Sequence, residues 1–122
     1  MVALSFEVPS FMTAAPKGAR VMVKAADCRT MAEIRAEIDR LDAELVALFA
    51  ARTGYIDRAG EIKAEVGLPA RITPRVEEVV ANVRRHAGTH GLPPDQIEKL
   101  WRRLIEWSIE REENHLGKDN AE

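Results

Sequence analysis

The sequence has little of what marks several common classes of protein. A single cysteine, Cys28, excludes an intrachain disulfide. No apolar run approaches the roughly 18 residues that a membrane-spanning helix needs. Aromatic residues are only 5% of the 122, and the net charge of −2 argues against nucleic acid as a partner. What is present, 46% hydrophobic and 31% charged residues, is the composition of one soluble helical domain with a modest core.

Motifs for several well-known chemistries are also missing. The sequence contains no glycine-rich phosphate loop and no nucleophile–base pair. Its three histidines, His86, His90 and His115, lack the spacing of metal ligands. We therefore predict no metal site.

Residues 1–26 carry no clear structural pattern. Glu7 and Pro9 interrupt the apolar residues that follow Met1, and no cationic segment precedes them, which argues against a signal peptide. We expect a disordered leader over residues 1–26, or a later true start such as Met22. We also expect a cytoplasmic protein with no membrane partner.

The strongest pattern is an apolar seam over residues 34–66, in which the spacing alternates between four and three residues. Thr30 and Glu33 form a capping box ahead of it, so we predict one helix over residues 30–66. At 1.5 Å per residue this helix is about 55 Å long. A compact chain of this length has a radius of gyration of only about 14 Å. We therefore expect a homodimer in which two long helices pair.

Two further helices follow. Gly67 and Pro69 end the first helix, and Thr73 with Pro74 predicts an N-cap and the start of a second helix that ends near residue 88. Pro94 begins a third helix, whose apolar face runs over residues 97–116. We predict an all-α fold of three helices, the first very long. The helical domain would cover residues 27–117, and residues 118–122 would be a polar tail.

Three polar residues interrupt these apolar faces. Arg52 occupies a position in the long seam, where a cation is costly unless an anion meets it. Ser108 and Glu112 lie four residues apart on the inward face of the third helix. Ser108 is also compatible with a plain helix interior, and Glu112 with a helix end that turns toward solvent. Both alternatives stay open at this point.

Four cations are candidates for a shared anion site. Lys63 follows Arg52 by 11 residues, so both face the same way about 16 Å apart along the helix. Arg75 opens the second helix, whose N-terminus favours anions. Arg35 precedes Arg52 by 17 residues, or about 25 Å, and only an antiparallel partner could bring it near Lys63. The pattern predicts a dicarboxylate site shared between two chains.

The residues from Met31 to Arg52 resemble the first helix of the all-helical, AroQ-type chorismate mutases. Arg35, Arg52 and Lys63 have that family's spacings of 17 and 11 residues, and the similarity extends over about residues 27–116. Ala26-Asp27-Cys28 and Pro74-Arg75-Val76 also resemble a close branch, the bacterial isochorismate pyruvate lyases.

This resemblance implies an intertwined homodimer with two active sites and no cofactor. Arg52 and the partner's Arg35 would hold the substrate carboxylates, and Lys63 would reach the ether oxygen. Arg75 would lie nearby, and Ser108 would line the pocket. The implied reaction is the pericyclic rearrangement of chorismate to prephenate in aromatic amino-acid biosynthesis. Such a reaction needs a compact bound conformer and a stabilised ether oxygen, but no base or nucleophile.

Two departures from the family leave alternatives. Many members have glutamine where this chain has Glu112, and a glutamate must be protonated to donate a hydrogen bond to the ether oxygen. Val76 replaces the family's usual glutamate, and the lyases also have an apolar residue there. The alternatives are an isochorismate pyruvate lyase of a salicylate or siderophore pathway, an aminochorismate mutase, and a non-catalytic dimerisation or regulatory module. Glu112 and the shorter loop after the first helix favour the mutase.

Overall fold

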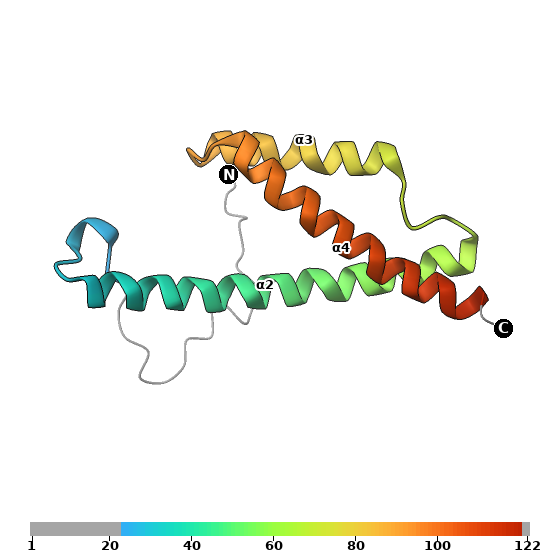
Figure 1. Ribbon diagram of the computed structural model, residues 1–122, viewed down its shortest axis with the longest axis horizontal. Helices are drawn as coiled ribbons and strands as arrows, with labels where there is room; N and C mark the ends of the chain where they lie inside the picture. The colour runs from blue at the N-terminus through green and yellow to red at the C-terminus, as the bar shows by residue number, and fades with distance from the viewer. Residues whose placement is uncertain (1–22, 121–122) are drawn as a thin grey trace, which may run out of the picture. The chain divides into compact units, whose positions relative to one another are not determined.

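The computed structural model describes residues 23–120, and within that range the chain is helical with no strand. A short 3₁₀ helix, η1 (Ala25–Asp27), precedes three α-helices (Figure 1). These are α2 (Met31–Val66), α3 (Thr73–Thr89) and α4 (Pro94–Asn120). The predicted all-α class with a very long first helix is confirmed. Most of the predicted leader lies outside the described residues.

The capping box predicted at the start of α2 is present. The Glu33 amide donates to Thr30 Oγ1 over 3.1 Å, and the Thr30 amide donates to Glu33 Oε1 over 3.1 Å. The Arg29 amide also donates to Glu33 Oε1, over 2.6 Å. These bonds satisfy amides that the first turn of a helix leaves without intrahelical partners.

The other end of α2 closes through a glycine. Gly67 has a φ of +78°, a conformation that glycine adopts without a Cβ penalty. The amides of Gly67 and Leu68 both donate to the carbonyl of Lys63, each over 2.9 Å. These two hydrogen bonds fix the backbone of Lys63 at the helix end, independently of the contacts of its side chain.

The ends of α3 and α4 differ slightly from the sequence prediction. Ile72, not Thr73, is the N-cap of α3, because the Ile72 carbonyl already accepts from the amides of Arg75 (2.9 Å) and Val76 (3.1 Å). At the other end of the chain, α4 continues to Asn120. The predicted polar tail at residues 118–122 thus begins within the helix.

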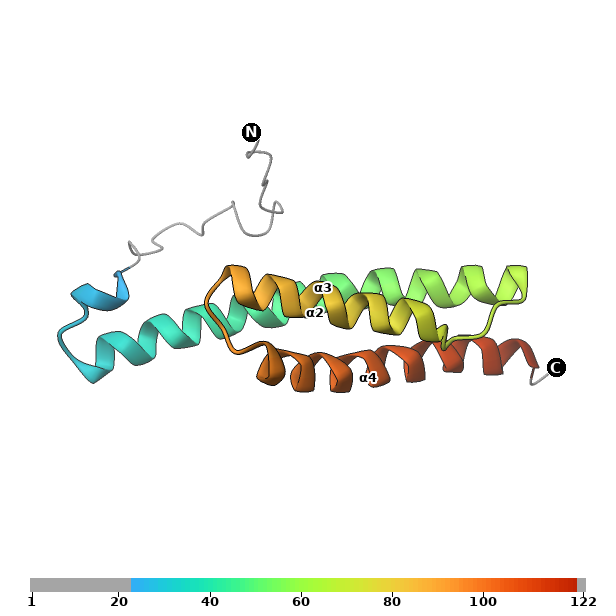
Figure 2. The same ribbon diagram turned by 90° about the horizontal axis from the view of Figure 1, so that it is seen from above.

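The chain divides into two compact units, Met1–Phe49 and Ala50–Glu122. In the second unit α3 and α4 pack side by side (Figures 1 and 2). The small core of this unit is aliphatic and is contributed mainly by these two helices: Ala70, Val80, Ile105 and Ile109, with Val76, Val79, Trp101 and Leu116 against it.

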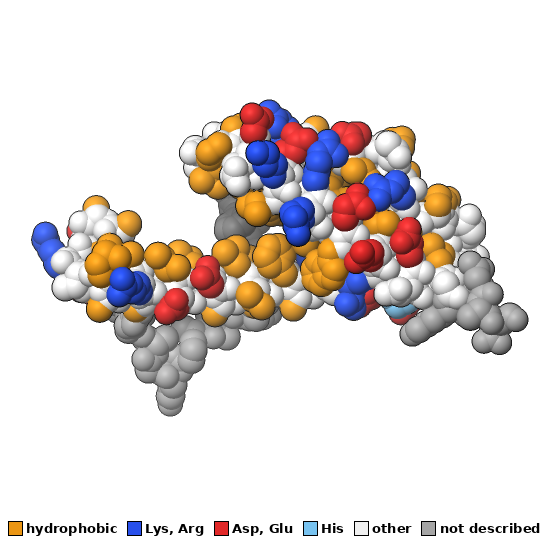
Figure 3. All heavy atoms as spheres, in the orientation of Figure 1, with side chains coloured by type: hydrophobic (Ala, Val, Ile, Leu, Met, Phe, Trp, Pro, Cys, Tyr) orange, Lys and Arg blue, Asp and Glu red, His pale blue; other side chains and the backbone are white. Residues whose placement is uncertain are grey.

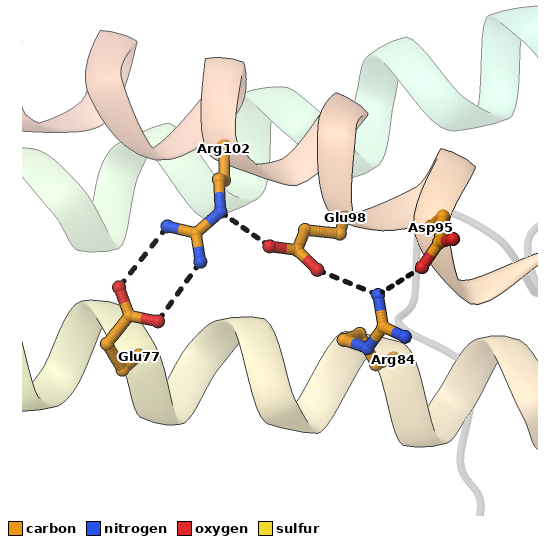
Figure 4. A network of polar contacts seen from close by, with 5 residues as sticks. All are labelled: Glu77, Arg84, Asp95, Glu98 and Arg102. Carbon is orange, nitrogen blue, oxygen red and sulfur yellow. Dashed lines mark hydrogen bonds and ion pairs between the residues drawn. The ribbon is translucent and has the colours of Figure 1, made fainter.

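A network of charged side chains also joins α3 to α4 (Figure 4). Arg102 binds both oxygens of Glu77, over 3.0 and 3.2 Å, and donates to Glu98 over 2.7 Å. Arg84 continues the network by donating to Glu98 over 2.7 Å and to Asp95 over 2.9 Å. A single exposed ion pair contributes little to stability, so any contribution of these residues comes from the network as a whole.

The apolar seam of α2 is exposed in the single chain, and Figure 3 shows hydrophobic side chains along this helix. Ile38 is 49% exposed, Leu45 51% and Tyr55 80%. Leu100, which the sequence places on the buried face of α4, is also exposed. It lies about 100° around the helix from Trp101, which packs against the core. Within residues 23–120, no helix is both long enough and apolar enough to cross a membrane.

At Gly60, α2 lies close to the side chain of His115 on α4. A Cβ placed on Gly60 would lie 2.9 Å from Cδ2 of His115, which is closer than Cβ atoms pack, and 3.2 Å from its Cβ, which is a tight contact. Gly54, on the same helix, has no neighbour within 4 Å of such a Cβ. Only Gly60 is therefore required by packing.

We predict that Gly60→Ala destabilises the protein by about 1–3 kcal/mol, because the His115 side chain must leave its place or α4 must move away from α2. The control Gly54→Ala should instead stabilise the protein by up to about 1 kcal/mol, since alanine favours the helix. Urea unfolding at one fixed protein concentration measures both values. Equal effects of the two substitutions would contradict the close approach at Gly60.

Candidate active site

A cavity of about 290 Å³ opens in the second unit between α2, α3 and α4. Five of the six predicted site residues line it: Arg52, Lys63, Arg75, Ser108 and Glu112. The rest of the lining is aliphatic: Ile56, Ala59, Ala70, Ile72, Val76, Val79, Ile105 and Ile109. The cavity thus combines a cluster of charged groups with an apolar wall.

Arg52 reaches the cavity from α2 and meets Ser108 on α4. Arg52 Nη1 donates to Ser108 Oγ over 2.8 Å. The Ser108 hydroxyl in turn donates to the Leu104 carbonyl over 2.9 Å, so its oxygen acts as the acceptor toward the guanidinium. Ser108 is buried. It is therefore a partner of Arg52 and not only a small residue tolerated in a helix.

Lys63 and Glu112 form the most buried contact of the cavity. Lys63 Nζ donates to Glu112 Oε1 over 2.5 Å and to the Ala70 carbonyl over 2.7 Å. The side chain of Glu112 is only 7% exposed, and that of Lys63 is 18% exposed. The alternative that Glu112 turns toward solvent is wrong, because the core side of α4 extends as far as this residue.

Arg75 stands at the start of α3, and its side chain is mostly exposed while Nη1 donates to Glu78 over 2.9 Å. The pKa of the Arg52 guanidinium is lowered from its usual value, first by burial and then by the positive charge of Arg75. The charge of Glu112 opposes this shift. Arg52 still remains a cation at neutral pH. Because the positive charges of Arg52 and Arg75 repel each other, an anionic ligand bound between them would be stabilising.

Arg35 is the one predicted site residue that does not line the cavity. It belongs to α2 within the first unit and is exposed. The single chain therefore supplies Arg52, Lys63 and Arg75 to the cavity, and the prediction that a second chain supplies Arg35 stays a prediction.

Sequence reasoning missed two parts of this cavity. The Ala70 carbonyl is a backbone group, so no residue type signals that it holds Lys63. Ile72 extends the apolar wall, but it lies in a loop where no periodicity marks a buried face. Within residues 23–120, no three His, Cys, Asp or Glu side chains lie close enough together to hold a metal ion.

The chemistry of the cavity suits a small organic anion. Three cations can meet carboxylates, a protonated Glu112 carboxyl can donate to a polar oxygen, and the aliphatic wall can cover a carbon ring. The fold and the cavity together define an all-α protein with a cationic pocket of the size of a small molecule.

The sequence profile described as chorismate mutase type II matches residues 34–113. The chain belongs to this family.

Three relatives illustrate the range of the similarity. The T-protein of Enterobacter agglomerans is 35% identical over 79 residues, or 65% of this chain and 21% of the relative. The isochorismate pyruvate lyase of Pseudomonas aeruginosa is 34% identical over 84 residues, or 68% of this chain and 81% of the relative. The chorismate mutase of Methanocaldococcus jannaschii is 27% identical over 86 residues, or 70% and 87% of the two chains. The chain spans about a fifth of the length of the T-proteins that it matches.

We predict that Lys63→Met destabilises the protein by roughly 3 kcal/mol at neutral pH, because it leaves Glu112 buried without a counter-ion. It also removes the donor that the Ala70 carbonyl accepts from. The double variant Lys63→Met with Glu112→Leu should recover most of this loss, since no buried charge remains. Chemical unfolding of the two variants and the wild type measures the difference. A double variant that is less stable than Lys63→Met would contradict this account of the pair.

Proposed function

We propose that this protein is a chorismate mutase, which rearranges chorismate to prephenate in aromatic amino-acid biosynthesis in the cytoplasm. The observation that carries the proposal is the cavity in which Arg52, Lys63 and Arg75 stand around one apolar wall, with Ser108 and Glu112 beside them. Chorismate carries two carboxylates, an ether oxygen and a carbon ring. Each of these groups finds a chemical complement in the cavity.

The proposed catalysis is physical and needs no covalent intermediate. Arg52 binds a substrate carboxylate and favours the compact conformer in which the two reacting carbons meet. Lys63 stabilises the negative charge that develops on the ether oxygen as the C–O bond breaks. The ammonium is already held by the Ala70 carbonyl and by Glu112, so it requires little reorganisation during the reaction.

Glu112 has a role that depends on its proton. An ionised carboxylate cannot donate a hydrogen bond, whereas a protonated one can donate to the ether oxygen from the position beside Lys63. We therefore propose that the active form of the site holds a protonated Glu112.

We further propose that the functional unit is an intertwined homodimer in which the partner supplies Arg35 to each cavity. The exposed seam of α2 supports a dimer, since large apolar side chains such as Leu41, Leu45 and Ile62 would be covered by a second helix. The absence of Arg35 from the cavity lining of its own chain supports the exchange.

An isochorismate pyruvate lyase is the second candidate. Two observations favour it: the similarity to the lyase of Pseudomonas aeruginosa covers 81% of that protein, and the α3 side of the cavity is apolar at Ile72 and Val76. Glu112 beside Lys63 favours the mutase instead, because it places a proton donor at the ether oxygen. A non-catalytic module is the third candidate. The cations that line the cavity argue against it, because a structural module does not need them.

Product analysis with each substrate alone tests the proposal. The purified protein receives chorismate or isochorismate, the loss of substrate absorbance is followed, and the products are separated by chromatography. We expect prephenate from chorismate. Salicylate and pyruvate from isochorismate, with no prephenate, would assign the protein to the lyases. If an intact dimer forms neither product, the protein is a non-catalytic module.

We predict that Glu112→Leu lowers kcat on the order of a hundredfold, because it removes the hydrogen-bond donor beside the ether oxygen. Glu112→Gln keeps an amide N–H donor, so this variant should keep most of kcat. Initial rates with saturating chorismate measure both variants. A Glu112→Leu variant with the wild-type kcat would remove Glu112 from the proposed role.

We predict that two inactive variants complement each other when one dimer contains both. Arg35→Ala and Arg52→Ala each damage every site of their own homodimers. A mixed dimer keeps one of its two sites intact if Arg35 crosses the interface, so isolated mixed dimers should have about half of the wild-type activity, and the unseparated mixture about a quarter. Tandem purification through two different affinity tags isolates the mixed dimers. If each Arg35 serves its own chain, these mixed dimers stay inactive.

A further inference from the structure

A second set of contacts joins α2 to α4 beside the cavity, outside its lining. Arg111 binds Asp57 with two parallel hydrogen bonds: Nε donates to Oδ1 over 3.0 Å, and Nη2 donates to Oδ2 over 2.7 Å. His115 Nε2 lies 3.4 Å from Asp57 Oδ1, and its ring packs on Gly60. Neither Asp57 nor Arg111 lines the cavity.

This contact falls between the two polar contacts of the cavity along both helices. On α2, Asp57 lies between Arg52 and Lys63 in sequence. On α4, Arg111 lies between Ser108 and Glu112. Since a helix moves as a rigid rod over this length, a slide or rotation of α4 that displaces Arg111 also displaces Ser108 and Glu112.

The Asp57–Arg111 pair is ionised at neutral pH. The hydrogen bonds from Arg111 are the main reason why the pKa of Asp57 is lowered, and His115 adds a smaller effect in the same direction. The pKa of Arg111 is raised by the same pair. The forked geometry fixes the direction of approach as well as the distance, which a single hydrogen bond does not.

We propose that Asp57 and Arg111 are positioning residues for the reaction, and that they set the register of α4 on α2 so that Glu112 meets Lys63 and Ser108 meets Arg52. This inference rests on the proposed function. Neither residue touches the substrate. Their effect is on the geometry of the groups that do.

The exposure of the pair separates positioning from simple stabilisation. The Asp57 side chain is 30% exposed and that of Arg111 is 40% exposed. Pairs this open add little to the free energy of unfolding. A shift of about 1 Å in a catalytic group, by contrast, is costly to the rate. The loss of this pair should therefore appear in kcat more than in stability.

The same helix offers a matched control. Arg102, also on α4, binds both oxygens of Glu77 on α3, and its side chain is 43% exposed (Figure 4). Like Arg111, Arg102 makes two hydrogen bonds to one carboxylate, although it uses Nη1 and Nη2 and Glu77 is more exposed (57%) than Asp57 (30%). Neither Arg102 nor Glu77 lines the cavity. This pair also joins α4 to α3 and not to α2.

The test compares Arg111→Lys with Arg102→Lys, each of which keeps the charge and loses the fork. We expect Arg111→Lys to lower kcat on the order of tenfold with a smaller change in KM. Arg102→Lys should change kcat less than about twofold. Circular dichroism and the oligomeric state should match the wild type in both. The reversed pair, Asp57→Arg with Arg111→Asp, should regain part of the kcat that either single substitution loses.

An unchanged kcat in Arg111→Lys, or an equal loss in Arg102→Lys, would overturn the inference. A wild-type protein that forms no prephenate would instead refute the proposed function. Crystal structures of the wild type and Asp57→Asn then decide the inference separately. A Lys63 Nζ to Glu112 Oε1 distance that lengthens by about 1 Å or more in the variant supports positioning. An unchanged distance overturns it.

Discussion

The arrangement of the cavity in the second unit depends on the hydrogen bonds that hold the ammonium group of Lys63. Lys63 Nζ donates to the Ala70 carbonyl in the loop before α3 and to Glu112 on α4, so three segments of the chain converge on one charge. The Lys63 carbonyl is fixed as well, by the amides of Gly67 and Leu68. A buried cation is costly without such partners, and here the partners also bring the walls of the cavity together.

The remaining charge of the cavity explains why it should bind an anion. Glu112 compensates Lys63, whereas Arg52 donates to the neutral hydroxyl of Ser108, and the positive charge of Arg75 lies nearby. Family membership and this charge balance therefore lead to the same class of ligand from independent starting points. The apolar wall adds the requirement that the anion carries a carbon skeleton.

Much of this could be predicted from the sequence, because helical periodicity is a local property. The spacing of 11 residues places Arg52 and Lys63 on one face, and the spacing of four places Ser108 and Glu112 together. Both pairs line the cavity. The N-cap of α3 was predicted one residue too late, because the Ile72 carbonyl and not the Thr73 side chain begins the hydrogen-bond ladder.

The remaining parts could not be predicted because they depend on tertiary packing. The Ala70 carbonyl is a backbone group that every residue type carries, so the sequence does not indicate that it binds Lys63. Asp57 and Arg111 are 54 residues apart, and 18 basic and 20 acidic residues offer far too many pairings to select one by sequence. The need for glycine at position 60 appears only once His115 is placed against it. Contacts between helices therefore cannot be predicted from the periodicity of a single sequence.

A crystal structure with a bound bicyclic dicarboxylate that mimics the compact conformer of chorismate tests the role of Lys63 most directly. We expect one carboxylate on Arg52 and the ether oxygen within hydrogen-bond distance of Lys63 and Glu112, with the Ala70 carbonyl still holding the ammonium. A ligand bound elsewhere, with the Lys63–Glu112 contact unchanged, would contradict this role.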